Sequence, residues 1–391
     1  MPKELSMRYG CNPNQGNARV FMSADRDLPV EVLNGAPSYI NMMDALNSWQ
    51  MVRDLRKTLA LPAAASFKHV SPAGAAVAAP LNEALRQAYF VADMELSPLA
   101  TAYARARGAD RLAAFGDWVA LSEEVDESTA LLIKREVSDG VIAPGYSDTA
   151  LALLKSKKGG SYPVFRIDSD FEPGLLERRE LFGMTLQQER NTFLPDDSFF
   201  ANIVTANREL SEQAQRDLTV ATIAVKYTQS NSVCLAFDGQ VIGNGAGQQS
   251  RVHCVRLAAS KADNWYLRQH PHVRALKFKK GVKRSERINA IDLFLQEEAT
   301  PVELRAWEAN FAEVPQLLSA EEKRSWLDGL EGVALSSDAF FPFRDNLDRA
   351  YRSGVKYVVQ AGGSIQDDEV VAAADEYGMV MIHSGVRLFH H

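Results

Sequence analysis

Short apolar runs alternate along this chain with segments of helical spacing, a pattern typical of α/β proteins. In the first half we expect the chain to break after its first strand at the Pro/Gly-containing segment 70–74. A helix is expected to end on Gly140, since glycine is common just after the last helical turn. The predicted strands of this half lie at 63–67, 111–122, 140–144 and 162–167, and the predicted helices at 82–94, 128–140 and 149–160.

The second half repeats this alternation. The apolar run 218–227 is predicted to be a strand, and 233–245 a hairpin that turns at Asp238 and Gly239. Further strands are predicted at 333–343, 356–360 and 379–382, and helices at 250–263, 344–354 and 367–378.

Segments of the two halves correspond to each other, 67–78 to 226–236 and 115–144 to 335–361. We therefore expect an ancient duplication, with one unit at 1–180 and the other at 181–391. A charged helical insertion is expected in the second unit around 265–332. Its tryptophans, Trp265, Trp307 and Trp326, are more typical of core positions than of ligand contacts.

Composition narrows the class of protein. A chain of 391 residues with 46% hydrophobic and 24% charged residues is typical of a soluble protein that buries a large core. The sequence has no stretch typical of a signal peptide or membrane span, so we expect a cytoplasmic protein without membrane contact. A net charge of -7 argues against a general nucleic-acid binder.

The cysteines Cys11, Cys234 and Cys254 are far apart and lack the spacing of a zinc site. We expect them to be buried thiols. One basic stretch, KFKKGVKRSER at 277–287, stands against the acidic balance. It is either a solvated loop and helix start or a landing patch for an anionic ligand.

Four polar segments carry candidate chemistry. In SFKHVSPAG, Lys68 and His69 follow an apolar strand, where α/β proteins often bind ligands, although a solvated lysine beside a core histidine is the plainer interpretation. In KYTQSNSV, the crowded polar side chains must bond each other, a ligand or an ion if they are buried, and Asn231 could face a developing oxyanion. A polar turn between strands explains this segment equally well.

The third segment, GNGAGQQSR, leads into a helix, where backbone amides and Arg251 would suit an anion, although a plain turn fits the pattern too. In the fourth, SSDAFFPFRDN, the phenylalanines are either core residues or a stacking wall for a flat heterocycle. Asp345 and Asn346 would then bond the edge of that heterocycle.

Eight strings, taken in order, resemble the AICAR transformylase family, which forms the C-terminal part of a bifunctional purine-biosynthesis enzyme. They are RYGCNPNQ, LNGAPSYIN, SFKHVSPAGAAV, REVSDGVIAPGY, AVKYTQSNSVC, GAGQQSRVHCVRLA, SDAFFPFRDN and RLFHH. The resemblance spans residues 8–391 and departs at Asn14, where the family usually has histidine.

This resemblance implies two cytidine-deaminase-like three-layer α/β/α units and a homodimer with active sites at its interface. It implies formyl transfer from 10-formyltetrahydrofolate to the amino group of AICAR, 5-aminoimidazole-4-carboxamide ribonucleotide. Since the cyclohydrolase domain of the family does not precede RYG here, we expect a separate IMP cyclohydrolase. The zinc-deaminase signatures HxE and PCxxC do not occur, which argues against deaminase chemistry.

The resemblance also assigns roles to residues. His69 would accept the amine proton, Lys68 would protonate the departing folate nitrogen, and Asn231 would stabilise the oxyanion. The nucleotide would contact Arg8, Tyr9, Asn41, Asp139, Arg251, Phe340 and Arg387. The folate would contact Gly116, Phe341, Pro342, Phe343, Asp345 and Asn346. A structural potassium ion would be held near Val225, Thr228, Ser230, Ser232, Asp338, Leu388 and His390.

Two other functions stay open from sequence. One is a noncatalytic module that binds AICAR or folate, and the intact Lys68, His69 and Asn231 argue against it. The other is a transferase that uses formate and ATP, for which the Walker-type phosphate loop is missing.

Overall fold

The computed structural model describes residues 2–22, 26–296 and 299–391. The strands are β1 (Glu4–Ser6), β2 (Arg19–Phe21), β3 (Val30–Asn34), β4 (Ala63–Lys68), β5 (Ser71–Val77), β6 (Asp117–Leu121), β7 (Ser138–Ala143), β8 (Val164–Ile167), β9 (Leu176–Leu181), β10 (Met184–Glu189), β11 (Val233–Phe237), β12 (Gln240–Gly245), β13 (Val333–Ser337), β14 (Val355–Gln360) and β15 (Val380–His383). The helices are α1 (Tyr39–Leu59), α2 (Glu83–Ala88), α3 (Pro98–Gly108), α4 (Glu127–Arg135), α5 (Asp148–Lys155), α6 (Glu212–Lys226), α7 (Arg251–Leu267), α8 (Pro271–Arg274), α9 (Arg284–Leu295), α10 (Pro301–Glu308), α11 (Ala320–Leu327), α12 (Asp345–Tyr351) and α13 (Asp367–Glu376), with 3₁₀ turns η2 (Lys157–Gly160) and η3 (Asp197–Phe200).

One large mixed sheet runs through the molecule in the order β15-β14-β13-β11-β12-β5-β4-β6-β7-β8-β3. On one side of its centre, β4 pairs antiparallel with β5 and β6, and β6, β7 and β8 pair in parallel. On the other side, β11 pairs antiparallel with β12 and β13, and β13, β14 and β15 pair in parallel. Apart from β3, which pairs antiparallel with β8 at one edge, the two sides therefore have the same strand order and the same pairing directions.

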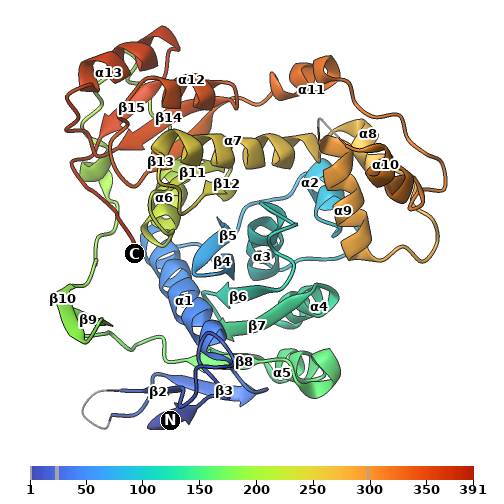
Figure 1. Cartoon of the computed structure of the whole chain (residues 1–391), viewed down its shortest axis with the longest axis vertical. Helices are drawn as coiled ribbons and strands as arrows, with labels where there is room; N and C mark the ends of the chain where they lie inside the picture. Colours follow the sequence, from blue (N-terminus) through green and yellow to red (C-terminus); the bar gives the residue numbers. More distant parts are fainter. Residues whose placement is uncertain (1, 23–25, 297–298) are drawn as a thin grey trace.

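Helices cover both faces of this sheet, which gives three layers (Figure 1). Because neighbouring strand residues point to opposite faces, β4 sends Ala64 to one core and Ala63, Ala65 and Phe67 to the other. The first core includes side chains from α3, α4 and α7, and the second includes side chains from α1 and α6. The α/β class predicted from the sequence is confirmed.

The run 218–227 is helical, so its predicted strand is wrong. It forms most of α6, which packs against α1, β11 and β13 and is buried on nearly every side. A helix covered on every side reads as a continuous apolar run, and its many β-branched residues favoured a strand. Ser211, the residue before α6, caps the helix, because its hydroxyl accepts a hydrogen bond from the backbone amide of Ala214.

Two glycines predicted to end or break an element instead lie inside strands. The helix α4 ends at Arg135, and Gly140 belongs to β7, where a Cβ atom would lie 2.1 Å from the Trp118 ring. Likewise Gly74 lies in β5, where a Cβ atom would lie 2.1 Å from the carbonyl oxygen of Ala106 on α3. Both glycines allow close packing, and the chain turns earlier, at His69 and Val70.

Other predictions are confirmed, among them the hairpin turn at Asp238 and Gly239, which both have positive φ. The helices α8 to α11 lie within residues 265–332, and of the three tryptophans predicted to be core residues, Trp265 and Trp307 are buried and Trp326 is half-buried. Of the cysteines, Cys234 and Cys254 are buried as expected, but Cys11 is exposed in a surface turn. Among the helices in the described ranges, none is both long enough and apolar enough to cross a bilayer.

Candidate functional site

The turn between β4 and β5 carries two of the candidate catalytic residues. His69 and Val70 both adopt left-handed backbone conformations, with φ of 53° and 58°. This conformation is costly for a β-branched residue, so neighbouring contacts must hold it in place. The carboxylate of Asp44 on α1 does so by accepting a hydrogen bond of 2.7 Å from the Val70 backbone amide. The turn leaves the His69 side chain exposed.

Lys68, the last residue of β4, points to the loop before β6. Its Nζ atom donates a 2.7 Å hydrogen bond to the carbonyl oxygen of Phe115. The next residue, Gly116, has a positive φ of 77°, and a Cβ atom there would lie 3.8 Å from the carboxylate of Asp139. Asp139 in turn forms a 2.9 Å ion pair with Lys158. The structure therefore brings Lys68, Gly116 and Asp139 into one neighbourhood.

Asp44 is a buried carboxyl beside this turn. Burial raises its pKa, while the hydrogen bond from Val70 and the charge of His69 lower it. Asp44 lies outside the motifs that predict the site from the sequence. The available signal was an aspartate among the core-facing positions of a helix, because buried acids are rare unless they have a partner.

Asn231 belongs to a polar loop between α6 and β11. Its side-chain oxygen accepts a 2.9 Å hydrogen bond from Arg251, and its Nδ2 donates to the carbonyl oxygen of Gln249 at 3.2 Å. Arg251, at the start of α7, also pairs with the buried carboxylate of Asp338. The expected polar segments around residues 231 and 251 thus contact each other directly.

One hydrogen bond joins this loop directly to the region of the histidine turn, and Asn244 on β12, which also bonds Thr228 of the loop, provides a second link. The backbone amide of Gln229 donates to the hydroxyl of Ser71 at 3.3 Å, and Asn244 donates to the carbonyl of Pro72 at 2.9 Å. Ser71 lies two residues after His69, and Gln229 two residues before Asn231. Residues from the two halves of the sheet therefore meet where β5 and β12 run side by side.

The other predicted nucleotide contacts are spread more widely. Asn41 is occupied in the cap of α1, where it accepts from the Ser38 amide at 3.2 Å. Arg8 is exposed, and Tyr9 is half-buried with its ring 5.8 Å from the Arg8 guanidinium. Arg387 is exposed and stacks over Phe389 near the C-terminus. The described contacts connect none of these residues to His69.

The aromatic segment after β13 divides between core and surface. Phe341 is fully buried in the core, and its amide donates to the side-chain oxygen of Gln360 at 2.6 Å. Phe340 and Phe343 are exposed, and Pro342 is half-buried. Asn346 is buried and donates both to the Phe343 carbonyl and to Asp345 at 2.9 Å. Only the exposed rings are free to stack on a ligand.

The predicted potassium ligands gather around Asp338. Its carboxylate accepts from the Ser230 hydroxyl at 2.6 Å and from the Ser232 amide at 2.9 Å, and its carbonyl accepts from Leu388 at 2.8 Å. Ser230 also exchanges hydrogen bonds of 3.0 Å with the backbone of His390. Thr228 joins the same region through Asn244, at 3.1 Å, and its amide bonds the Val225 carbonyl.

Together these features define a three-layer α/β protein with basic, amide and hydroxyl groups gathered where the two sides of one sheet meet. The chain belongs to the AICARFT/IMPCHase bienzyme family, whose sequence model matches residues 1–261.

Several curated relatives resemble the chain along its whole length. Each is named bifunctional purine biosynthesis protein PurH. The relative from Elusimicrobium minutum is 30% identical over 390 residues, that from Magnetococcus marinus 31% over 396, and that from Bacillus cereus 29% over 393. The alignments cover 100% of this chain and 59%, 60% and 60% of these relatives. The chain thus spans about three-fifths of the length of the relatives that it matches.

Proposed function

We propose that this protein transfers a formyl group from 10-formyltetrahydrofolate to the 5-amino group of AICAR, giving formyl-AICAR and tetrahydrofolate in purine biosynthesis. Family membership supports this reaction class. The single observation that carries the proposal is the Ser71–Gln229 hydrogen bond, which joins the turn of Lys68 and His69 to the loop of Asn231. A base, a proton donor and an amide are the groups that this transfer requires.

In the proposed reaction, the AICAR amine attacks the formyl carbon and forms the new C–N bond. The exposed imidazole of His69 takes the proton that the amine loses. Asn231, whose amide is fixed by Arg251 and the Gln249 carbonyl, donates a hydrogen bond to the developing oxyanion. As the bond from the formyl carbon to the folate nitrogen breaks, Lys68 gives that nitrogen a proton.

Binding of the nucleotide is assigned in the same proposal to Arg8, Tyr9 and Arg387 for its phosphate, since guanidinium groups match phosphate oxygens with paired hydrogen bonds. Phe340 and Phe343, both exposed, would stack on the flat rings of the substrates. We further propose that the two sides of the sheet, whose strand orders match, are two cytidine-deaminase-like units.

The direct test is to mix the purified protein with AICAR and 10-formyltetrahydrofolate and to follow tetrahydrofolate formation. Turnover that needs both substrates is expected. Binding of AICAR without turnover would instead favour a noncatalytic module, and turnover with formate and ATP in place of the folate would favour another transferase.

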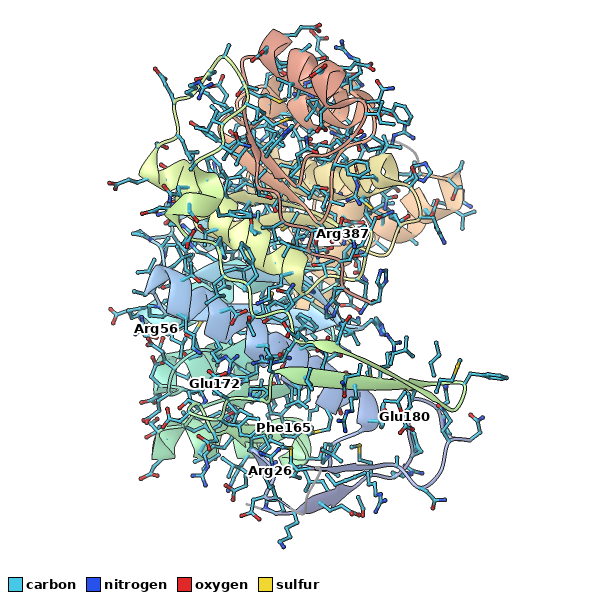
Figure 2. The ribbon with its side chains drawn as sticks, turned by 90° about the vertical axis from the view of Figure 1, so that its left-hand side faces the viewer. Arg26, Arg56, Phe165, Glu172, Glu180 and Arg387 are labelled. Atoms are coloured by element: carbon cyan, nitrogen blue, oxygen red, sulfur yellow. The ribbon has the colours of Figure 1, made fainter. Side chains whose placement is uncertain are left out.

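We propose that the protein works as a homodimer with active sites at the interface, and the hairpin β9–β10 supports this assembly. Every residue of both strands is exposed, and the hairpin extends away from the body of the molecule (Figure 2). At its tip, Leu181, Phe182 and Met184 are 59%, 97% and 62% exposed. An isolated two-stranded hairpin is marginally stable in water, so a second copy packed on this apolar tip would stabilise it.

Replacing Leu181 and Phe182 by serine is expected to raise the dimer dissociation constant at least about a hundredfold, since each apolar side chain buried at an interface contributes about 1.5 kcal/mol or more. Sedimentation velocity over a concentration series measures this change. Ile365→Ser is the matched control, because Ile365 is 100% exposed elsewhere on the surface. A dimer unaffected by the double substitution would contradict the role of the hairpin.

A bound potassium ion fits the oxygen-rich cluster around Asp338. The hydroxyl of Ser232 and the side-chain oxygen of Asn244 are buried there without a hydrogen-bond partner. Buried oxygens without partners are costly, and a cation would satisfy them. In the described residues no group of three or more His, Cys, Asp or Glu side chains could hold a metal, so carbonyl and hydroxyl oxygens would supply most ligands. Potassium would supply structural charge here and no chemical step.

Exchanging potassium for tetramethylammonium at constant ionic strength is expected to lower the free energy of unfolding. The loss is about 2.7 kcal/mol if the ion was present at a hundred times its dissociation constant. Urea unfolding measures it. Ser232→Ala is expected to weaken this response, whereas Ser48→Ala should retain it, because the Ser48 hydroxyl is buried but bonds the Ala45 carbonyl. Equal stability in both salts would refute the ion.

A further inference from the structure

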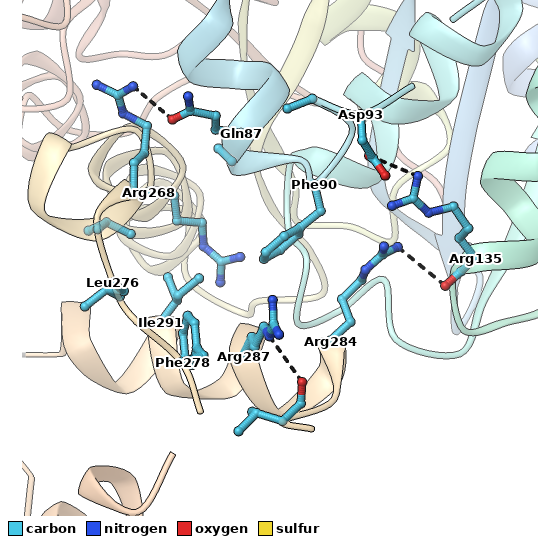
Figure 3. A pocket seen from close by; sticks show the side chains of 15 residues that line it. Gln87, Phe90, Asp93, Arg135, Arg268, Leu276, Phe278, Arg284, Arg287 and Ile291 are labelled. Atoms are coloured by element: carbon cyan, nitrogen blue, oxygen red, sulfur yellow. Dashed lines mark hydrogen bonds and ion pairs between the residues drawn. The ribbon is translucent and has the colours of Figure 1, made fainter. Parts of the chain in front are cut away.

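A cavity lies away from the proposed catalytic residues, between the end of α2 and the helices α8 and α9 (Figure 3). Its volume is about 610 Å³. Pockets that take drug-sized ligands have volumes of about 300–1,000 Å³, so this one could hold a nucleotide-sized molecule. None of the residues assigned to formyl transfer lines it.

Most of the charged residues that line this cavity are arginines. Arg135, Arg268, Arg274, Arg284 and Arg287 line it, and Asp93 is the one acidic residue in the lining. In Figure 3 the side chains of Arg268, Arg284 and Arg287 converge around the ring of Phe90. Such a concentration of like charges is unfavourable unless counter-charges lie close by.

Carboxylates compensate only part of this charge. Asp93 pairs with Arg135 at 3.1 Å, Glu136 with Arg284 at 2.8 Å, and Asp292 with Arg268 at 3.5 Å. The Glu136 carboxylate is shared further with Arg107 and Arg111. Arginines therefore outnumber the carboxylates that serve this cluster.

The remaining two lining arginines bond neutral groups. Arg274 donates to the side-chain oxygen of Gln87 at 3.1 Å, and Arg287 donates to the carbonyl of Val282 at 3.2 Å. Neither has a carboxylate within ion-pair distance in the described part of the chain. Burial also lowers the pKa of Arg268 despite nearby acids, so a bound anion would stabilise its charged form.

Two aromatic rings lie among these cations. The Arg284 guanidinium lies 5.8 Å from the ring of Phe90, and the Arg287 guanidinium lies 5.5 Å from the ring of Phe278. Phe90 has a positive φ of 57°, an uncommon conformation for a bulky residue. Rings beside guanidinium groups offer a stacking surface for a flat heterocycle next to donors that match phosphate.

We propose that this cavity is a binding site for a nucleoside di- or triphosphate, separate from the site of formyl transfer. Arg274 and Arg287, together with Arg268, would bind the phosphates through paired hydrogen bonds. Phe278 would contact the base. The basic stretch 277–287 contributes Arg284 and Arg287 to this site. Of the two interpretations that the sequence allowed for this stretch, part of it would therefore have the anion-binding one.

Calorimetric titration with ADP, pyrophosphate and citrate tests the proposal, because it reads binding and not turnover. We expect ADP to bind more tightly than pyrophosphate, and citrate to bind weakly. The double variant Arg274→Ala/Arg287→Ala should weaken ADP and pyrophosphate at least tenfold. Phe278→Leu should weaken ADP while pyrophosphate binding is unchanged. Arg305→Ala on α10 is the matched control, since it removes an exposed arginine outside the lining.

Circular dichroism establishes that each variant is folded before titration. Arg387→Ala, at the proposed substrate-phosphate site, should leave binding at this cavity unchanged. Binding that Arg387→Ala abolishes and the double variant retains would overturn the proposal, since the anion would then occupy the site of formyl transfer. Absence of millimolar binding by ADP and pyrophosphate, or equal loss in Arg305→Ala, would overturn it as well.

Discussion

His69→Ala is expected to lower kcat for formyl transfer by about 10²- to 10⁴-fold, the usual contribution of a general base. The reason is local, because the strained turn exposes this imidazole beside the loop that carries Asn231. Asn231→Ala is expected to lower kcat by roughly 10²- to 10³-fold through the loss of one oxyanion donor. Steady-state assays with saturating AICAR and folate measure both effects.

Lys68 needs a separate test, because its ammonium group also ties β4 to the loop of Phe115. Lys68→Arg keeps a cation that can donate to this carbonyl, but a guanidinium is a far weaker proton donor to the departing nitrogen. We therefore expect Lys68→Arg to bind both substrates and to lose most of its turnover. His272→Ala, which removes an exposed histidine on α8, is the control for the single substitutions. Full activity in His69→Ala and Lys68→Arg would rule out the proposed mechanism.

The sequence predicted the α/β class and most strands because strand-forming runs such as 63–67 are short and mainly apolar, and this one is bounded by Pro62 on one side and by Lys68 on the other. It did not predict α6, because a helix buried on every side loses the periodic pattern that distinguishes helix from strand. The predictions for Gly74 and Gly140 were also wrong, because these glycines allow close packing against α3 and against the Trp118 ring. Such contacts join residues far apart in sequence, and local patterns do not contain them.

For the candidate site, the sequence motifs named polar segments around Asn231 and Arg251 that contact each other in the structure, while the roles of these residues stay predictions. The supporting residues were harder to predict. Asp44 on α1 holds the turn through Val70, which lies 26 residues later in the chain. The buried ion pairs of Arg107 with Asp117 and Glu136 likewise depend on the approach of α3, β6 and the end of α4. The sequence around a single acidic residue or arginine in such a segment does not indicate which distant residue it will pair with.

These ion pairs form a buried cluster beneath β4. Arg107 bonds Asp117, which accepts a 2.5 Å hydrogen bond from Ser66 on that strand. Glu136 contacts Arg107, Arg111 and Arg284. Burial alone would raise the pKa of Glu136, but Arg111, Arg107 and Arg284 outweigh it and hold the pKa at about 2. For Arg111, burial outweighs the nearby carboxylate and lowers the pKa. The whole cluster therefore contributes less to the free energy of unfolding than the lowered pKa of Glu136 alone suggests.

Glu136→Gln is expected to destabilise the protein by about 3–5 kcal/mol, because it keeps the side-chain shape but leaves buried arginines without their counter-charge. Urea unfolding at neutral pH measures the loss. Glu95→Gln, an exposed position, should change stability by less than about 0.5 kcal/mol.

The pH dependence of the same measurement separates lost charge from altered packing. The folded pKa of Glu136, about 2, lies below its ordinary value of 4.5. Its ionised form therefore stabilises the fold fully above about pH 4.5, and this contribution of about 3 kcal/mol is lost as the pH falls toward 2. The difference between wild type and Glu136→Gln should shrink over this interval. A difference that stays constant down to pH 2 would show that the substitution acts through packing, and that the carboxylate charge does not hold the three arginines together.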